Sequence, residues 1–172
     1  MRKTSQNDAP RIAIFPGSFD PFTIGHESIV LRALPLFDQI VVAIGVNYSK
    51  RPLTTPEERL TWIRGVFRHE PKVSVMHYTG LTVDAARQCG ASFLLRGVRM
   101  VQDFEYEKNM AETNRAMSGI ETVLLYTLPE YGHISSSTVR ELVEYGHDVS
   151  AFLPKNCDPA LIPATWKVKK EI

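Results

Sequence analysis

Hydrophobic positions along the chain fall into two alternating patterns. Short and nearly continuous apolar runs rich in β-branched residues predict strands, and apolar residues recurring every three or four positions predict helices. The expected strands are residues 11–15, 40–46, 73–77, 93–95 and 122–126. The expected helices are residues 25–36, 56–68, 82–88, 104–117 and 136–145.

This alternation predicts the fold class. Continuously apolar strands are typical of a parallel sheet that is covered on both faces. Strands alternating with amphipathic helices predict an α/β protein with a Rossmann-like, doubly wound, five-stranded parallel sheet and helices on both faces. One helix start is well marked, because Thr55 can cap it, Pro56 suits its first position, and Glu57 and Glu58 suit the positive end of its dipole.

The length of 172 residues predicts a single domain. We expect this domain to span residues 11–156, preceded by a disordered extension (residues 1–10) and followed by a C-terminal tail (residues 157–172). The basic run at residues 167–170 is typical of a solvated chain end.

Composition and charge narrow the possible functions. With 44% hydrophobic and 23% charged residues and a net charge of +1, the chain suggests neither nucleic acid nor an anionic membrane as a partner. It has no apolar run of about 20 residues and no apolar segment of a signal peptide, so we expect a cytoplasmic protein. Cys89 and Cys157 are far apart and belong to no metal-binding pattern, so they are interpreted as packing residues.

The segment after the first strand is the first candidate for chemistry, because ligands of open α/β sheets bind beyond the carboxyl ends of the strands. It contains neither GxGxxG nor GxxxxGK[ST]. Gly17 allows close backbone approach, and Gly25 and His26 lie where a helix N-terminus favours an anion. The imidazole of His26 could donate to a phosphate oxygen, or the segment could be only a tight turn with a capping histidine.

Two later loops also carry cations at strand ends. Lys50 follows the second strand, where it could bind a phosphate-bearing substrate or simply face solvent. Arg96 and Arg99, on either side of Gly97, could form a fork for phosphate oxygens. The acidic residues at 103–107 could instead neutralise both arginines in structural ion pairs.

The last candidate is the run of hydroxyl side chains at residues 135–138, one turn before Arg140. Consecutive hydroxyls at a helix start can cap the helix, and they can also bind a triphosphate. The residues leave both interpretations open.

Four segments together carry a resemblance to a known family. The first, PGSFDPFTIGH (16–26), is similar to the signature of the nucleotidyltransferase superfamily related to class I aminoacyl-tRNA synthetases. With NYSKRP (47–52), LLRGVRMVQDFEYE (94–107) and YGHISSSTVR (131–140), it resembles the bacterial phosphopantetheine adenylyltransferases over about residues 11–156. The segments occur in the family's order and at similar spacing, so their joint match is far more specific than each alone.

The resemblance implies a reaction and its partners. Such an enzyme transfers AMP from ATP to 4′-phosphopantetheine, giving dephospho-CoA and pyrophosphate in coenzyme A biosynthesis. It implies Mg²⁺ held mainly by the ATP phosphates, without a dedicated protein metal site, and a homohexamer that can also bind CoA. It further implies direct in-line attack of the substrate phosphate on the α-phosphorus, without a covalent enzyme intermediate.

The resemblance also implies roles for individual residues. The expected catalytic residues are His26, Lys50 and Arg99, and the expected binding residues for phosphopantetheine are Ser18, Lys50, Thr82 and Arg96. The residues expected to bind ATP are Ser18, Phe19, His26, Gly97, Val98, Arg99, Glu107, Tyr131, Gly132, His133, Ile134, Ser135, Ser136 and Ser137. The sequence departs from the family pattern at Ser18 (commonly Thr), at His133 (often Phe) and around Thr82.

Three other interpretations compete with this one. An enzyme of the same superfamily could use another acceptor, such as nicotinate mononucleotide, or transfer CMP, but the segment from Arg96 to Glu107 resembles the phosphopantetheine branch. A non-catalytic nucleotide sensor would not need His26, Lys50 and Arg96 together. A purely structural protein would require every motif to be accidental.

Overall fold

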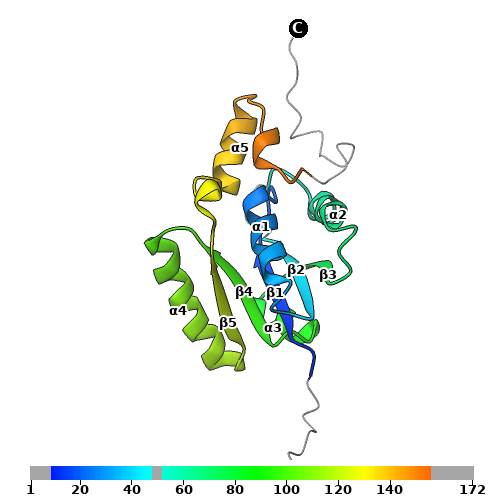
Figure 1. The fold of residues 1–172 in the computed structure, drawn as a ribbon, viewed down its shortest axis with the longest axis vertical. Coiled ribbons are helices and arrows are strands. Elements are labelled where there is room, and N and C mark those ends of the chain that lie inside the picture. Colours follow the sequence, from blue (N-terminus) through cyan, green and yellow to red (C-terminus); the bar gives the residue numbers. More distant parts are fainter. Residues whose placement is uncertain (1–8, 48–51, 156–172) are drawn as a thin grey trace, which may run out of the picture.

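Five parallel strands form one sheet in the computed structural model, which describes residues 9–47 and 52–155 (Figure 1). The strands are β1 (Ile12–Gly17), β2 (Gln39–Gly45), β3 (Val73–Tyr78), β4 (Phe93–Val98) and β5 (Glu121–Tyr126). The helices are α1 (Ile24–Ala33), α2 (Pro56–Val66), α3 (Thr82–Gln88), α4 (Val101–Ser118) and α5 (Ser136–Glu144), with 3₁₀ turns η1 (Pro129–Tyr131) and η2 (Ser150–Phe152).

The strand order β3-β2-β1-β4-β5 confirms the predicted doubly wound sheet. Strand β1 lies in the centre and pairs with β2 from Ile12↔Gln39 to Gly17↔Ile44. On its other side it pairs with β4. From β1 the chain adds β2 and β3 on one side of the sheet and then returns to add β4 and β5 on the other side. Such a switch point, here between the neighbouring strands β1 and β4, leaves a crevice at their carboxyl ends.

Alternate side chains of β1 build two cores, one on each face of the sheet. Ala13 and Phe15 belong to the larger core, which also holds buried residues of α1, α2 and α5. Ile14 belongs to the smaller core, which holds Ala85 and Ala86 of α3. Helix α4 lies along β4 and β5 (Figure 1), and Glu107 is its one buried residue.

The strands next to the crevice are longer than the sequence predicts. The pattern ends the fourth strand at Leu95, yet Arg96 and Gly97 still pair with Leu124 and Leu125 of β5. Strand β1 likewise continues through Pro16 and Gly17. The hydrophobic pattern predicts both strands too short. Hydrogen bonds to a neighbouring strand keep the backbone extended even at an arginine or a glycine, which the pattern does not report.

Other expectations have mixed outcomes. The start of α2 is confirmed, since the N–H of Glu58 donates to the Thr55 hydroxyl (3.1 Å) and the N–H of Thr55 donates to the Glu58 carboxylate (2.8 Å). Helix α4 begins at Val101, three residues earlier than predicted. Cys89 is half-buried and its thiol donates to a backbone carbonyl.

No helix among the described residues is long and apolar enough to cross a membrane. Lys50, Cys157, most of the proposed N-terminal extension and the whole C-terminal tail lie outside the described residues, so the predictions made for them stay predictions.

Candidate active site

Two adjoining cavities lie at the carboxyl ends of β1 and β4. The larger one, of about 430 Å³, extends from the loop after β1 to the start of α5. The smaller one, of about 220 Å³, lies between β1, α3 and α4. Residues that line both cavities are Pro16, Gly17, Ser18, Arg96 and Glu107.

The loop from Gly17 to Pro21 is shaped by the packing of one aromatic ring. Phe19 adopts a left-handed backbone conformation, with φ of 49°. Its ring folds back over Gly17, where a Cβ atom would lie only 2.7 Å from the ring. The same ring packs edge-on against the imidazole of His26, with centroids 5.1 Å apart. Gly17 is therefore required here by the Phe19 ring itself, a reason that the motif alone did not reveal.

His26 lies in the first turn of α1 and is held in one orientation. Its Nδ1 accepts a hydrogen bond from the backbone N–H of Thr23 (3.0 Å), and the Thr23 hydroxyl lies at 3.0 Å from the same nitrogen. A backbone N–H can only donate, so Nδ1 carries no proton and Nε2 does. Burial, followed by the positive charges of Arg99 and Arg96, lowers the pKa of His26 to about 4. At neutral pH the ring is thus an uncharged donor through Nε2.

The arginines that follow the fourth strand are paired with carboxylates of α4. Arg96 donates to Glu107 through Nε (2.8 Å) and Nη2 (2.5 Å). Arg99 donates to Asp103 through Nε (3.1 Å). The ion pairs considered as an alternative are therefore present. Both arginines nevertheless line the larger cavity, so the ion pairs do not remove them from it.

Arginines also cover backbone carbonyls around the larger cavity. Four guanidinium groups donate in this way: Arg59 to Ser18 (2.6 Å), Arg96 to Pro16 (2.5 Å), Arg99 to Ile134 (3.3 Å) and Arg140 to Asp20 (2.7 Å). A carbonyl oxygen is the negative end of the peptide dipole and would repel an anion. These contacts therefore make the loops more favourable for a phosphate.

The hydroxyl run at the start of α5 connects this helix to the first loop. Ser135 caps α5, because its Oγ accepts from the N–H of Thr138 (3.0 Å). Ser136 donates from Oγ to the carbonyl of Pro21 (2.9 Å). Ser135, Ser136 and Ser137 all line the larger cavity, so capping and cavity lining occur together.

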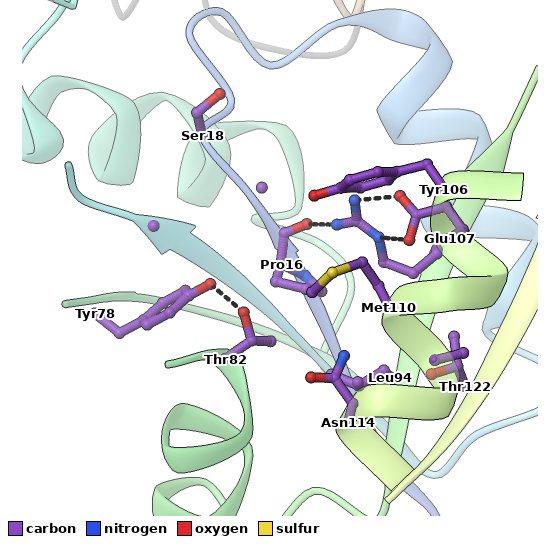
Figure 2. Close-up of a pocket in the computed structure, with 14 residues that line it drawn as sticks. Pro16, Ser18, Tyr78, Thr82, Leu94, Tyr106, Glu107, Met110, Asn114 and Thr122 are labelled. Atoms are coloured by element: carbon purple, nitrogen blue, oxygen red, sulfur yellow. Dashed lines mark hydrogen bonds and ion pairs between the residues drawn. The ribbon is translucent and has the colours of Figure 1, made fainter. Parts of the chain in front are cut away.

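The smaller cavity has a mixed polar and apolar lining (Figure 2). On one side the hydroxyls of Tyr78 and Thr82 share a hydrogen bond of 2.9 Å. On the other side α4 contributes Tyr106, Met110 and Asn114. The Oγ1 of Thr122, on β5, is buried without a hydrogen-bond partner among the described residues, the only such side-chain atom there. The sequence did not single out the α4 residues, because they follow an ordinary helical pattern.

Most of the predicted site residues meet at these cavities. The larger cavity is lined by Ser18, Phe19, His26, Arg96, Gly97, Arg99, Glu107, Tyr131, Ile134, Ser135, Ser136 and Ser137. Thr82 lines the smaller one. Three predicted ATP contacts, Val98, Gly132 and His133, line neither cavity. Val98 is buried, and His133 packs against Phe152 instead.

Several lining residues of the larger cavity were missed from the sequence. Thr23, Asp103, Thr127 and Arg140 belong to this group, although Asp103 is part of the acidic run at 103–107 and Arg140 lies one turn inside the last helix. Arg140 has no carboxylate partner among the described residues, where Arg96 and Arg99 each have one. It is therefore the least neutralised of the three arginines in the lining.

The described part of the chain holds no group of three or more His, Cys, Asp or Glu side chains that could bind a metal ion. The carboxylates that line the larger cavity, Asp103 and Glu107, both engage arginines. These donors do not fit a dedicated cation site.

Solved structures with a similar fold include a bifunctional NMN adenylyltransferase/ADP ribose pyrophosphatase from Francisella tularensis. It superposes with a TM-score of 0.65 over 88% of this chain, at 14% identity. A second structure of that kind, complexed with AMP and a manganese ion, gives a TM-score of 0.66 at 13% identity. The chain spans about half the length of these structures, 46% of each. At such identity the likeness establishes the fold alone.

Sequence comparison is more specific. Residues 14–142 match the cytidylyltransferase-like family. The phosphopantetheine adenylyltransferase of Bacteroides fragilis is 49% identical over 148 residues, covering 86% of this chain and 99% of the relative. That of Flavobacterium johnsoniae is 52% identical over 144 residues, covering 84% and 95%. The fold, the two cavities and these relatives lead to one conclusion: the chain belongs to the phosphopantetheine adenylyltransferases, within the cytidylyltransferase-like family.

Proposed function

We propose that the chain transfers AMP from ATP to 4′-phosphopantetheine, giving dephospho-CoA and pyrophosphate. The observation that carries this proposal is the arrangement of the two cavities. The larger one has the arginines, hydroxyls and helix N-termini that suit a triphosphate. The smaller one, of about 220 Å³, has a lining of mixed polarity, which suits a flexible arm with amide groups. Arg96 lines both and can hold the phosphate that joins the two ligands.

Each ligand then has its own set of contacts. ATP occupies the larger cavity, with its phosphates over His26 and the N-terminus of α1. The pantetheine arm occupies the smaller cavity, where Thr82, Asn114 and the unpartnered hydroxyl of Thr122 supply polar contacts. Lys50, which lies outside the described residues, is assigned to the substrate phosphate on the family resemblance.

We infer a direct in-line displacement. The phosphate of phosphopantetheine is already anionic and attacks the α-phosphorus of ATP without a general base or a covalent intermediate. The Nε2–H of His26 donates to an oxygen of the reacting phosphates, and Arg99 adds positive charge. These fixed donors stabilise the charge that builds up in the transition state more strongly than mobile water would.

Magnesium enters this proposal as part of the nucleotide substrate. As the family resemblance implies, the ion is held mainly by the phosphates of ATP. Its role is to neutralise charge on the triphosphate.

We also propose that the chain assembles as a homohexamer, as the family resemblance implies. Helix α4 offers a suitable surface, since the apolar side chains of Val101, Phe104, Tyr106 and Met117 are more than 40% exposed. A partner subunit would remove this area from water.

One experiment tests the reaction and its acceptor. The purified protein is mixed with magnesium-ATP and either 4′-phosphopantetheine or nicotinate mononucleotide, and pyrophosphate release is followed. Release that depends on phosphopantetheine supports the proposal. Release only with nicotinate mononucleotide would reassign the acceptor, and ATP binding without release in both cases would favour a nucleotide sensor.

A further inference from the structure

Arg59 is a buried cation that lines neither cavity. It lies on α2 and is only 3% exposed. Its Nη1 donates to the carbonyl of Ser18 (2.6 Å), and its Nε donates to the carbonyl of Thr55 (3.3 Å). Ser18 lines both cavities and Arg59 lines neither, so the guanidinium contacts the loop without itself bordering the cavities.

The position of this guanidinium determines where the next N–H points. A trans peptide is planar, with its C=O and N–H directed oppositely. The cis bond of the described chain is Asp20–Pro21, so the peptide between Ser18 and Phe19 is trans. With the Ser18 carbonyl directed at Arg59, the N–H of Phe19, a residue that lines the larger cavity, points away from Arg59. No acceptor in the described chain takes this N–H.

The rest of the loop is held just as firmly to the start of α2. Asp20 is 4% exposed, and its carboxylate accepts from the N–H groups of Leu53 (2.7 Å) and Thr54 (3.1 Å). Its carbonyl accepts from Arg140. These contacts hold the loop against the N-terminal end of α2, the helix that carries Arg59.

We propose that Arg59 is a positioning residue for the reaction, which orients the Ser18–Phe19 peptide so that the N–H of Phe19 donates to a phosphate oxygen of ATP. This inference rests on the proposed function and adds a residue that touches no ligand. An N–H that is fixed before the substrate arrives needs no reorientation while charge develops, and such preorganised donors contribute strongly to phosphoryl transfer.

The chain offers a matched control for the kinetic test. Arg64 lies on the same helix, donates to the backbone carbonyl of Val75 (3.4 Å) and lines neither cavity. We expect Arg59→Met to lower kcat about 100-fold, near the effect of losing one oxyanion donor, with a smaller change in the KM for ATP. Arg64→Met should keep kcat within about twofold, because its carbonyl is remote from the ligands.

The conservative variant separates positioning from plain stability. Arg59→Lys keeps a donor for the Ser18 carbonyl, so its kcat should be at least tenfold higher than that of Arg59→Met. Equal kcat losses in Arg59→Met and Arg64→Met, or no recovery in Arg59→Lys, would overturn the proposal. Thermal melts of the three variants show whether a loss of activity merely follows a loss of fold.

A second readout needs no turnover and no acceptor. Protein labelled with ¹⁵N-phenylalanine is titrated with magnesium and α,β-methylene-ATP, and the Phe19 amide is assigned with Phe19→Leu. We expect the Phe19 proton to shift downfield in the natural chain and in Arg64→Met, and to respond weakly in Arg59→Met. An unresponsive Phe19 amide in the natural chain refutes the inference, even if phosphopantetheine proves not to be the acceptor.

Discussion

Replacing His26 separates the two functions of its ring. Nδ1 accepts the N–H of Thr23 at the start of α1, and Nε2 carries the proton that the proposed mechanism directs at the phosphates. His26→Ala removes both functions. His26→Asn keeps an acceptor near the Nδ1 position but no donor at Nε2, whereas His26→Gln can place an amide N–H near the Nε2 position.

The expected size of each loss follows from these contacts. Removing one preorganised donor to a developing oxyanion costs about 2.7–4 kcal/mol, or roughly 10²–10³ in kcat. Leaving the N–H of Thr23 without an acceptor costs about 1 kcal/mol of folding stability. His26→Ala should therefore be nearly inactive and slightly less stable. His26→Asn should be as inactive but close to normal stability, and His26→Gln should retain part of the activity.

The assay is pyrophosphate release under saturating magnesium-ATP and phosphopantetheine, with a thermal melt of each variant. The reasoning predicts that activity follows the donor at Nε2, whereas stability follows the acceptor at Nδ1. If His26→Asn turns over within tenfold of the natural chain, the Nε2 proton does not stabilise the transition state and the assignment of His26 fails.

Three further predictions concern pH, an ion pair and a helix cap. Because folding lowers the pKa of His26 from 6.5 to about 4, the folded chain binds fewer protons than the unfolded chain between these values, and stability falls as the pH drops through this window. The free energy of unfolding is measured with denaturant at pH 7.5 and at pH 5. Between these pH values the natural chain should lose about 2 kcal/mol more of this free energy than His26→Asn does, and equal losses would contradict the lowered pKa. Glu107→Gln releases the guanidinium of Arg96, which is assigned to the phosphate of phosphopantetheine, and should raise the KM for phosphopantetheine about tenfold. A larger rise in the KM for ATP would instead support the nucleotide contact that the family resemblance implies for Glu107. Thr55→Ala removes a capping hydroxyl that lines neither cavity and keeps the backbone carbonyl that Arg59 contacts. It should cost about 1 kcal/mol of stability in a thermal melt while leaving kcat unchanged.

The periodicity of the chain was enough to predict the sheet, because apolar runs and amphipathic stretches report which faces are buried. The cap at Thr55 was equally predictable, since all its partners lie within four residues. The strand containing Arg96 was predicted too short, because its last residues are held by pairing with β5, and local polarity contains no information on that neighbour.

The sequence by itself therefore determined the fold class and indicated the loop after β1, because apolar periodicity reports burial and ligands of such sheets bind beyond the strand ends. Most residues of the larger cavity were expected from the resemblance of four segments to a known family. Only the tertiary structure decided which partner each arginine meets. The contacts of Arg59 and Arg140 with the first loop join residues 41 and 120 positions apart. Likewise, the smaller cavity exists only where α3, α4 and β5 come together. Such contacts depend on how distant segments pack, and a side chain's own neighbours in sequence do not encode them.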